Sequence, residues 1–154
     1  MTDPLNALVS FQKEFKLGRI RVRQCELDRS LYVYDDVAEG TPRSTYVTLE
    51  GKMVTALVIL GLWEPIDETP CFCIGYAVPE KYRNQGRATK AVSAAIAELK
   101  HAQPVNSPFY VEAIVGADNK PSRRVAEQII SDKPIAMTDE ISGLPAFRYV
   151  RKIE

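Results

Sequence analysis

The apolar positions follow a helical period at the start of the chain and a strand period through most of its first half. Helical spacing over residues 4–15 predicts a short helix that Gly18 ends. Apolar residues then alternate with arginines over residues 19–27, which predicts a half-buried strand. Further strands are predicted at residues 31–34, 44–49, 53–63 and 71–78. The acidic segments 35–43 and 64–70 predict loops, and Glu50-Gly51-Lys52 predicts a hairpin turn.

The second half of the chain alternates between helical and strand periods. Helices are predicted at residues 86–100 and 121–131, with strands at 109–115, 135–137 and 147–153. A length of 154 residues, 45% of them apolar, suits one domain with a real core. The pattern therefore predicts a single α/β (α+β) domain over residues 1–154, in which the middle strands form an antiparallel meander.

Composition narrows the function classes. Twenty basic residues balance twenty acidic ones, whereas a nucleic-acid-binding protein usually has a basic excess. Residues 1–6 lack a signal-peptide pattern, and the longest apolar stretch, residues 53–63, is too short to span a bilayer, so a cytoplasmic protein without membrane contact is expected. Three cysteines give no disulfide framework, and one histidine, His101, with no second cysteine pair makes a metal site unexpected.

The segment with the most chemical information is residues 74–91, which read IGYAVPEKYRNQGRATKA. A strand ends here and a helix begins near Gly86, and the first N–H groups of a helix attract phosphate. Basic side chains surround the glycine: Lys81, Arg83, Arg87 and Lys90. The segment is either a site for a phosphorylated ligand or a strand-to-helix turn with solvated basic residues. It matches neither a P-loop nor a dinucleotide-binding motif.

Two motifs resemble one family. The string RNQGRA at residues 83–88 is similar to the R/Q-x-x-G-x-G/A pyrophosphate loop of the GNAT superfamily of N-acetyltransferases. YRNQGRATKA looks like the YRGKGYATEA stretch of its ribosomal-protein N-terminal acetyltransferase branch. Residues 110–128 resemble the strand–turn–helix of that branch, and the matching positions are Glu112, Ala113, Val115, Asn119, Ser122 and Glu127. The resemblance covers residues 71–128.

The resemblance implies a fold and a cofactor site. The fold would be a mostly antiparallel sheet, splayed open between strands 71–78 and 109–115, with helices on both faces. Acetyl-CoA would be the acyl donor, with its pantetheine arm along Tyr76, Ala77 and Val78 and with Asn119 near that arm. Its pyrophosphate would bind the backbone N–H groups of Arg83, Asn84, Gln85, Gly86, Arg87, Ala88 and Thr89.

Catalytic candidates follow from the matched positions. Glu112 is the candidate base, and it is alternatively a glutamate that faces water or pairs with an arginine. A backbone N–H near Ala77 or Val78 would stabilise the oxyanion. Many GNAT enzymes place a tyrosine acid in the helix after the asparagine, but this chain has Ala126 there. Ser122, Tyr82 or water are the substitutes, and Ser122 has the alternative role of starting its helix.

The leading hypothesis is an acetyltransferase that moves an acetyl group from acetyl-CoA to a primary amine in a ternary complex. The acceptor would be a small molecule or a protein amine. Acidic residues 35–39 and 64–68 either attract a cationic acceptor or are plain solvated loops. The alternative is a non-catalytic acyl-CoA-binding module, which the missing tyrosine favours. A tRNA-modifying toxin would need a basic face, for which Arg123 and Arg124 are candidates. A homodimer is a further option, for which the sequence specifies no interface.

Overall fold

The computed structural model describes residues 3–154, which form one sheet of eight strands with three α-helices. The helices are α1 (Pro4–Lys16), α2 (Arg87–Ala102) and α3 (Lys120–Ile129), with one turn of 3-10 helix at Glu80–Tyr82. The strands are β1 (Arg23–Gln24), β2 (Leu31–Ala38), β3 (Thr41–Glu50), β4 (Met53–Ile66), β5 (Thr69–Ala77), β6 (Phe109–Gly116), β7 (Ile135–Thr138) and β8 (Pro145–Ile153).

The strands lie in the order β1-β2-β3-β4-β5-β6-β8-β7. Every neighbouring pair is antiparallel except β5 and β6, which run parallel because α2 crosses over between them. The expected single α/β domain with a mostly antiparallel sheet is confirmed.

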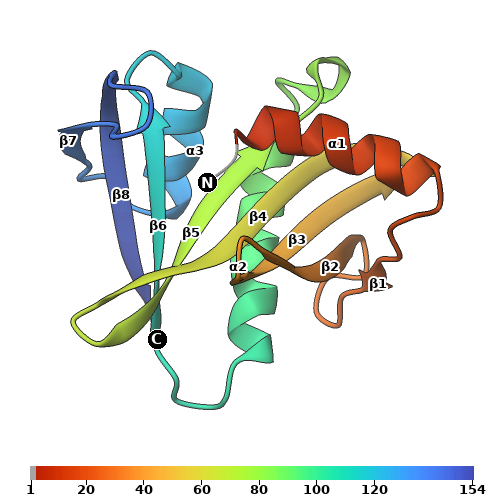
Figure 1. The fold of residues 1–154 in the computed structure, drawn as a ribbon, viewed down its shortest axis with the longest axis horizontal. Coiled ribbons are helices and arrows are strands. Elements are labelled where there is room, and N and C mark those ends of the chain that lie inside the picture. Colours follow the sequence, from red (N-terminus) through yellow and green to blue (C-terminus); the bar gives the residue numbers. More distant parts are fainter. Residues whose placement is uncertain (1–2) are drawn as a thin grey trace.

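Helices cover both faces of the sheet, as Figure 1 shows with α1 in front and α2 behind. Leu8 and Phe11 of α1 pack with Val47, Leu57 and Ile59 in a small core on one face. The larger core on the opposite face combines strand residues with the apolar sides of α2 and α3. We call these the α1 face and the α2 face of the sheet.

Strands β5 and β6 separate along their length. They pair only at Cys71, Phe72 and Cys73 of β5, and the last pair joins Cys73 to Glu112. Beyond it, residues 74–77 remain paired with β4 and residues 113–116 with β8, but not with each other. The upper ends of the two strands diverge in Figure 1. We call these two unpaired segments the splay, and the expectation of a splayed sheet is confirmed.

The predicted strand over residues 19–27 is largely wrong, because only Arg23–Gln24 pairs with β2. Ile20 and Val22 still pack against the α1-face core. The alternation of apolar residues and arginines therefore reflects burial of one side of the segment, although the segment outside Arg23–Gln24 has no strand beside it within residues 3–154 to form hydrogen bonds. The chain then turns, and the N–H of Cys25 donates to the carbonyl of Leu31.

The two acidic segments predicted as loops are tight hairpins. Strand β2 runs to Ala38 and β3 starts at Thr41, so only Glu39 and Gly40 form the turn, both at positive φ. Asp67 and Glu68 form the turn between β4 and β5 in the same way. Polar side chains hold the strands together here, because Arg43 donates to Asp36 at 2.9 and 2.6 Å. The prediction failed because charge was taken as a sign of irregular structure.

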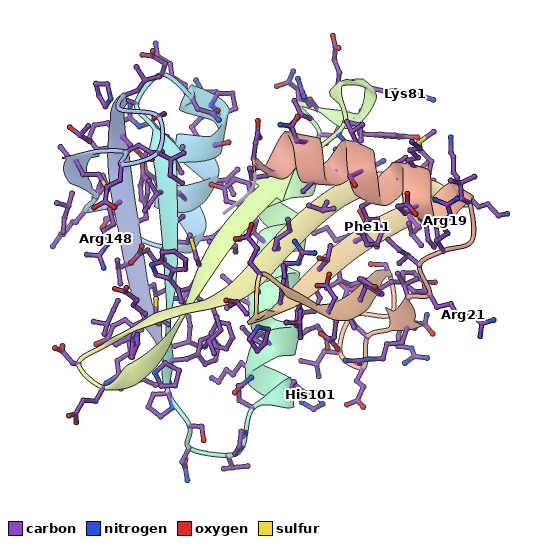
Figure 2. The ribbon with its side chains drawn as sticks, viewed as in Figure 1. Phe11, Arg19, Arg21, Lys81, His101 and Arg148 are labelled. Atoms are coloured by element: carbon purple, nitrogen blue, oxygen red, sulfur yellow. The ribbon has the colours of Figure 1, made fainter. Side chains whose placement is uncertain are left out.

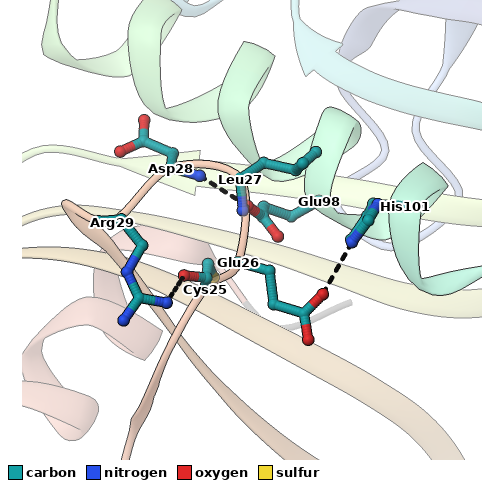
Figure 3. A network of polar contacts seen from close by, with 7 residues as sticks. All are labelled: Cys25, Glu26, Leu27, Asp28, Arg29, Glu98 and His101. Atoms are coloured by element: carbon teal, nitrogen blue, oxygen red, sulfur yellow. Dashed lines mark hydrogen bonds and ion pairs between the residues drawn. The ribbon is translucent and has the colours of Figure 1, made fainter.

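A buried carboxylate fixes the loop between β1 and β2. Glu98 of α2 is 6% exposed, and its Oε1 accepts the N–H groups of Leu27 and Asp28 at 2.5 and 2.8 Å (Figure 3). One turn later, Nε2 of His101 lies 2.7 Å from Oε2 of Glu26. This network, which we call the Glu98 latch, ties the β1–β2 loop to the C-terminal half of α2.

Candidate active site at the splay of β5 and β6

The connection from β5 to α2 is a tightly folded loop. Asn84 and Gly86 both have positive φ, of 61° and 72°. The side chain of Arg83 folds back so that its Nε donates to the carbonyl of Val78 at 2.9 Å. Figure 2 shows Lys81 at the outer edge of this loop. The loop geometry therefore comes from its own backbone and from Arg83.

The N-terminus of α2 offers free backbone donors. The first intrahelical bond runs from the N–H of Lys90 to the carbonyl of Gly86 at 3.1 Å. Gly86 is the N-cap and has no side chain to cap the helix. Within residues 3–154, the N–H groups of Arg87, Ala88 and Thr89 therefore have no hydrogen-bond partner. Such a helix start favours an anion.

One acidic residue near this loop was missed by sequence reasoning. Glu50, at the end of β3, lies 3.2 Å from Nη2 of Arg87. The same guanidinium lies 4.9 Å from the ring centre of Tyr82 and donates to Gln85 at 3.1 Å. These contacts hold Arg87 beside the helix start, and the pair with Glu50 reduces the positive charge expected there. Glu50 is 37 residues away, so no local motif could reveal it.

Glu112 lies at the base of the splay. It follows buried Val111 and precedes buried Ala113, which both belong to the α2-face core, so its side chain points to the α1 face. It is 6% exposed, and its Oε2 accepts two hydrogen bonds from Arg148 of β8, at 3.0 Å from Nε and 2.8 Å from Nη2. The structure therefore confirms the alternative in which Glu112 pairs with an arginine.

Arg148 was also missed by the sequence analysis. It lies 36 residues beyond Glu112 and one diagonal step away on the neighbouring strand, since Glu112 is opposite Val150 and Ile114 is opposite Arg148. The alternation within residues 147–153 places Arg148 on one face of a strand, but only the pairing of β6 with β8 shows its partner.

Asn119 and Ser122 form the start of α3. Oδ1 of Asn119 accepts the N–H of Ser122 at 3.3 Å, so the side chain of Asn119 caps this helix and Ser122 contributes its backbone N–H. The carbonyl of Ser122 accepts the hydroxyl of Tyr76 at 2.6 Å. Tyr76 of β5 thus points to the α2 face and links β5 to α3. Burial raises the pKa of this phenol well above its usual range.

The sequence-predicted residues divide into three groups. Residues 83–89 form one loop at the start of α2, while Ala77 and Val78 lie at the end of β5. Tyr76, Asn119 and Ser122 meet on the α2 face through α3. Glu112 stands on the opposite face. Trp63, near the end of β4, is 54% exposed and does not belong to the core.

Two cysteines share the α1 face with Glu112. Burial, and then the negative charge of Glu112, raise the pKa of both Cys71 and Cys73 to about 11. All three cysteines of the chain are free thiols. A thiol with this pKa is almost entirely protonated at neutral pH, so neither cysteine is prepared to act as a nucleophile.

Some of the basic residues that could contribute to an RNA-binding face make contacts within the fold. Arg19 pairs with Glu14 at 3.4 Å. Arg123 donates to the carbonyl of Ala117 at 3.1 Å, and its guanidinium lies 4.2 Å from the ring centre of Phe147. These contacts weaken the case for a basic substrate face.

A family model decides the classification. The acetyltransferase (GNAT) domain model matches residues 33–129, well over half of the chain. The chain belongs to the GNAT acetyltransferase family. No curated protein sequence matches it significantly. In residues 3–154 of this GNAT domain, no helix is long and apolar enough to cross a membrane, and no cluster of three or more His, Cys, Asp or Glu residues is arranged to hold a metal ion.

Solved structures share the fold of this GNAT domain at low identity. A GNAT-family acetyltransferase from Streptococcus pneumoniae is 10% identical, with a TM-score of 0.56 over 73% of this chain and 67% of that one. A chimera of spermidine N-acetyltransferase SpeG from Vibrio cholerae and hSSAT is 13% identical, with a TM-score of 0.57 over 71% and 66%. RimL, a ribosomal L7/L12 alpha-N-protein acetyltransferase in complex with coenzyme A, is 18% identical, with a TM-score of 0.52 over 72% and 62%.

Proposed function

We propose that this protein is an acyl-CoA-dependent N-acetyltransferase that moves an acetyl group from acetyl-CoA to a primary amine by direct attack in a ternary complex. The observation that carries the proposal is the combination of the splay with the uncapped start of α2. Strands β5 and β6 part after the Cys73–Glu112 pair, and the loop at Gly86 presents free N–H groups at the far end of β5.

The loop and the splay suit the two ends of a coenzyme A ester. Its pyrophosphate would accept from the N–H groups of residues 83–89, whose helix start favours negative charge. Residues 74–77 have backbone groups directed toward β6 without a strand to pair with, so the amides of the pantetheine arm would pair with them around Tyr76, Ala77 and Val78.

Glu112 would act on the attacking amine. An amine is mostly protonated at neutral pH and must lose a proton before it attacks a thioester. Within residues 3–154, Oε1 of Glu112 has no hydrogen-bond partner, because Arg148 binds Oε2 alone. Oε1 would accept the proton, and a backbone N–H near Ala77 or Val78 would stabilise the oxyanion. Ser122, through its hydroxyl, remains a candidate for returning a proton to the thiolate, with Asn119 beside it.

Two experiments test this function. Calorimetric titration with acetyl-CoA and then CoA should show saturable binding that weakens in Gly86→Glu, since a carboxylate there would repel the pyrophosphate. Release of the CoA thiol should then depend on an added primary amine. Absence of binding at high ligand concentration would overturn the proposal.

A non-catalytic acyl-CoA-binding module is the second candidate. The engagement of Glu112 with Arg148 and the presence of Ala126 at the position of the family's tyrosine favour it. Binding of acetyl-CoA without thiol release across a broad amine panel would select this function.

A further inference from the structure

Glu112 and Arg148 present opposite charges side by side on the α1 face, at the base of the splay. They come from neighbouring strands, β6 and β8, and their side chains meet at 2.8 Å. Figure 2 shows Arg148 on β8. The Arg148 side chain is 34% exposed, so solvent reaches part of its guanidinium.

The pair leaves hydrogen-bonding groups of both signs unused. A guanidinium has five N–H donors in a planar fork, and Oε2 of Glu112 takes only the edge formed by Nε and Nη2. In the part of the chain that the structure describes, Nη1 has no acceptor and Oε1 of Glu112 has no donor. The second edge of Arg148 is therefore available for a carboxylate, which such an edge binds with two parallel hydrogen bonds.

We propose that the amine acceptor is a free α-amino acid or a close analogue, whose carboxylate binds Arg148 while its amine lies at Oε1 of Glu112. This inference rests on the proposed function. An α-amino acid has its amine and carboxylate on one carbon, which suits two protein charges that touch each other. Arg148 is thus a specificity-determining residue in addition to holding Glu112.

The surroundings disfavour a polyamine. A second ammonium group would lie near the positive charge of Arg148, with no hydrogen bond to gain there. The acidic residues of β2 that might attract a polycation are already bound, Asp35 to Arg23 at 3.0 Å and Asp36 to Arg43 at 2.6 Å. A peptide N-terminus would offer Arg148 only a neutral carbonyl, which makes a weaker hydrogen bond than a carboxylate.

The reaction balances with these groups. The amino acid enters as its ammonium form and gives one proton to Oε1 of Glu112, from which the proton passes to solvent. The nitrogen lone pair forms a bond to the thioester carbonyl carbon, and the carbon–sulfur bond breaks. The second proton of the nitrogen goes to the departing thiolate. The products are the N-acetylamino acid, the CoA thiol and one proton.

The test compares acceptors that differ only in the carboxylate. Thiol release from acetyl-CoA is measured with the twenty amino acids, and kcat/KM for the best one is compared with that of its carboxamide, of a dipeptide starting with the same residue, and of spermidine. The wild-type protein should prefer the free acid over the carboxamide by about 10-fold or more, since a hydrogen bond to a charged group is roughly twice as strong.

Variants test whether Arg148 causes the preference for the free acid over the carboxamide. Arg148→Met should bring the acid and the carboxamide to equal kcat/KM, and Arg148→Lys should retain part of the difference. The ratio is the readout, because losing Arg148 also releases Glu112 and slows both substrates alike. Lys152→Met is the matched control, since Lys152 is a cation on the same face of β8 whose ammonium lies 3.4 Å from Glu154 and contacts neither Glu112 nor Arg148. It should keep the wild-type ratio.

Three outcomes overturn the inference and leave the proposed function standing. They are equal rates for the acid and the carboxamide in the wild-type protein, an unchanged preference in Arg148→Met, and transfer to spermidine or the dipeptide with every amino acid inert. The first and third need no variant, so a misfolded Arg148→Met protein does not block the test. Failure of acetyl-CoA to bind at all removes the proposed function itself.

Discussion

Two glutamates, Glu98 and Glu112, are each 6% exposed, but they are bound by different kinds of partner in two different regions of the molecule. Oε1 of Glu98 accepts two backbone N–H groups of the β1–β2 loop. Oε2 of Glu112 accepts two N–H groups of one side chain, Arg148, which is itself a third exposed. One carboxylate is bound by backbone, and the other by an arginine side chain at the splay.

The difference teaches that burial alone does not distinguish the proposed catalytic carboxylate from a structural one. Burying a charge costs free energy unless hydrogen bonds compensate, and both sites supply two bonds. Only Glu112 stands where two strands part. Glu98 lies eleven residues into α2, about 17 Å from its N-terminus at 1.5 Å per residue. Position relative to the splay is therefore what singles out Glu112 as the proposed base.

The strongest test of the comparison is Glu112→Gln. The amide cannot take a proton from the amine, so kcat should fall by roughly 100-fold or more, while the affinity for CoA stays unchanged. Steady-state kinetics and calorimetry measure the two quantities. Glu98→Gln, the same change in the other region, should leave kcat near the wild-type value. Equal losses in both variants would show that the two carboxylates do not differ in function.

The converse effect is expected in Glu98→Leu. Removing the acceptor leaves the N–H groups of Leu27 and Asp28 without partners, which should lower the free energy of unfolding by about 2–3 kcal/mol. Urea denaturation followed by circular dichroism measures this loss, and kcat of the folded fraction should not change. A stable variant with reduced kcat would mean that the Glu98 latch influences the active site.

Sequence reasoning recovered the elements whose signals are local. The loop at residues 83–89 follows from one glycine with its basic neighbours, and α3 follows from the helical period of residues 121–131. Both hairpins predicted as loops, at residues 35–43 and 64–70, failed for a physical reason. The second turn places Asp67 and Glu68 at positive φ, where glycine or asparagine is the usual signal, whereas the first turn does contain Gly40 and was missed because its acidic neighbours were taken as a loop.

The partners of the site residues could not be predicted. Arg148 reaches Glu112 across 36 residues through the pairing of β6 with β8, and Glu50 at the end of β3 reaches Arg87 at the start of α2 across 37 residues. No spacing rule within one segment contains that information. The proposed acceptor side of the site, which depends on Arg148, therefore needed the structure, whereas the proposed cofactor loop did not.

Substitutions at two glycines distinguish an effect on CoA binding from an effect on stability. Gly86 and Gly18 have φ of 72° and 73°, and an added Cβ would meet nothing within 4 Å at either position. Alanine at either one should cost roughly 1–2 kcal/mol of stability, because L-residues disfavour this region. Only Gly86→Ala should also weaken CoA binding. A decrease in affinity of about 10-fold is expected, which corresponds to losing one hydrogen bond between the pyrophosphate and a backbone N–H at the helix start. Calorimetry on both variants measures this, and equal CoA affinities would contradict the placement of the pyrophosphate.

The smallest effect is expected from Cys73→Ala, which removes the thiol in register with Glu112. Direct attack by the amine needs no acyl-enzyme, so kcat should stay within about 3-fold of wild type, and mass spectrometry should find no acetylated protein after incubation with acetyl-CoA. The fold raises the pKa of Cys73 from 9.0 to about 11, which means that it favours the neutral thiol. That stabilisation is complete below pH 9 and is lost as pH rises through 11, so wild type should lose stability over this range more steeply than Cys73→Ala. An acetylated Cys73, or a variant without activity, would contradict direct transfer in a ternary complex. It would indicate a two-step transfer through Cys73, with the Cys73–Glu112 pair as the reactive centre.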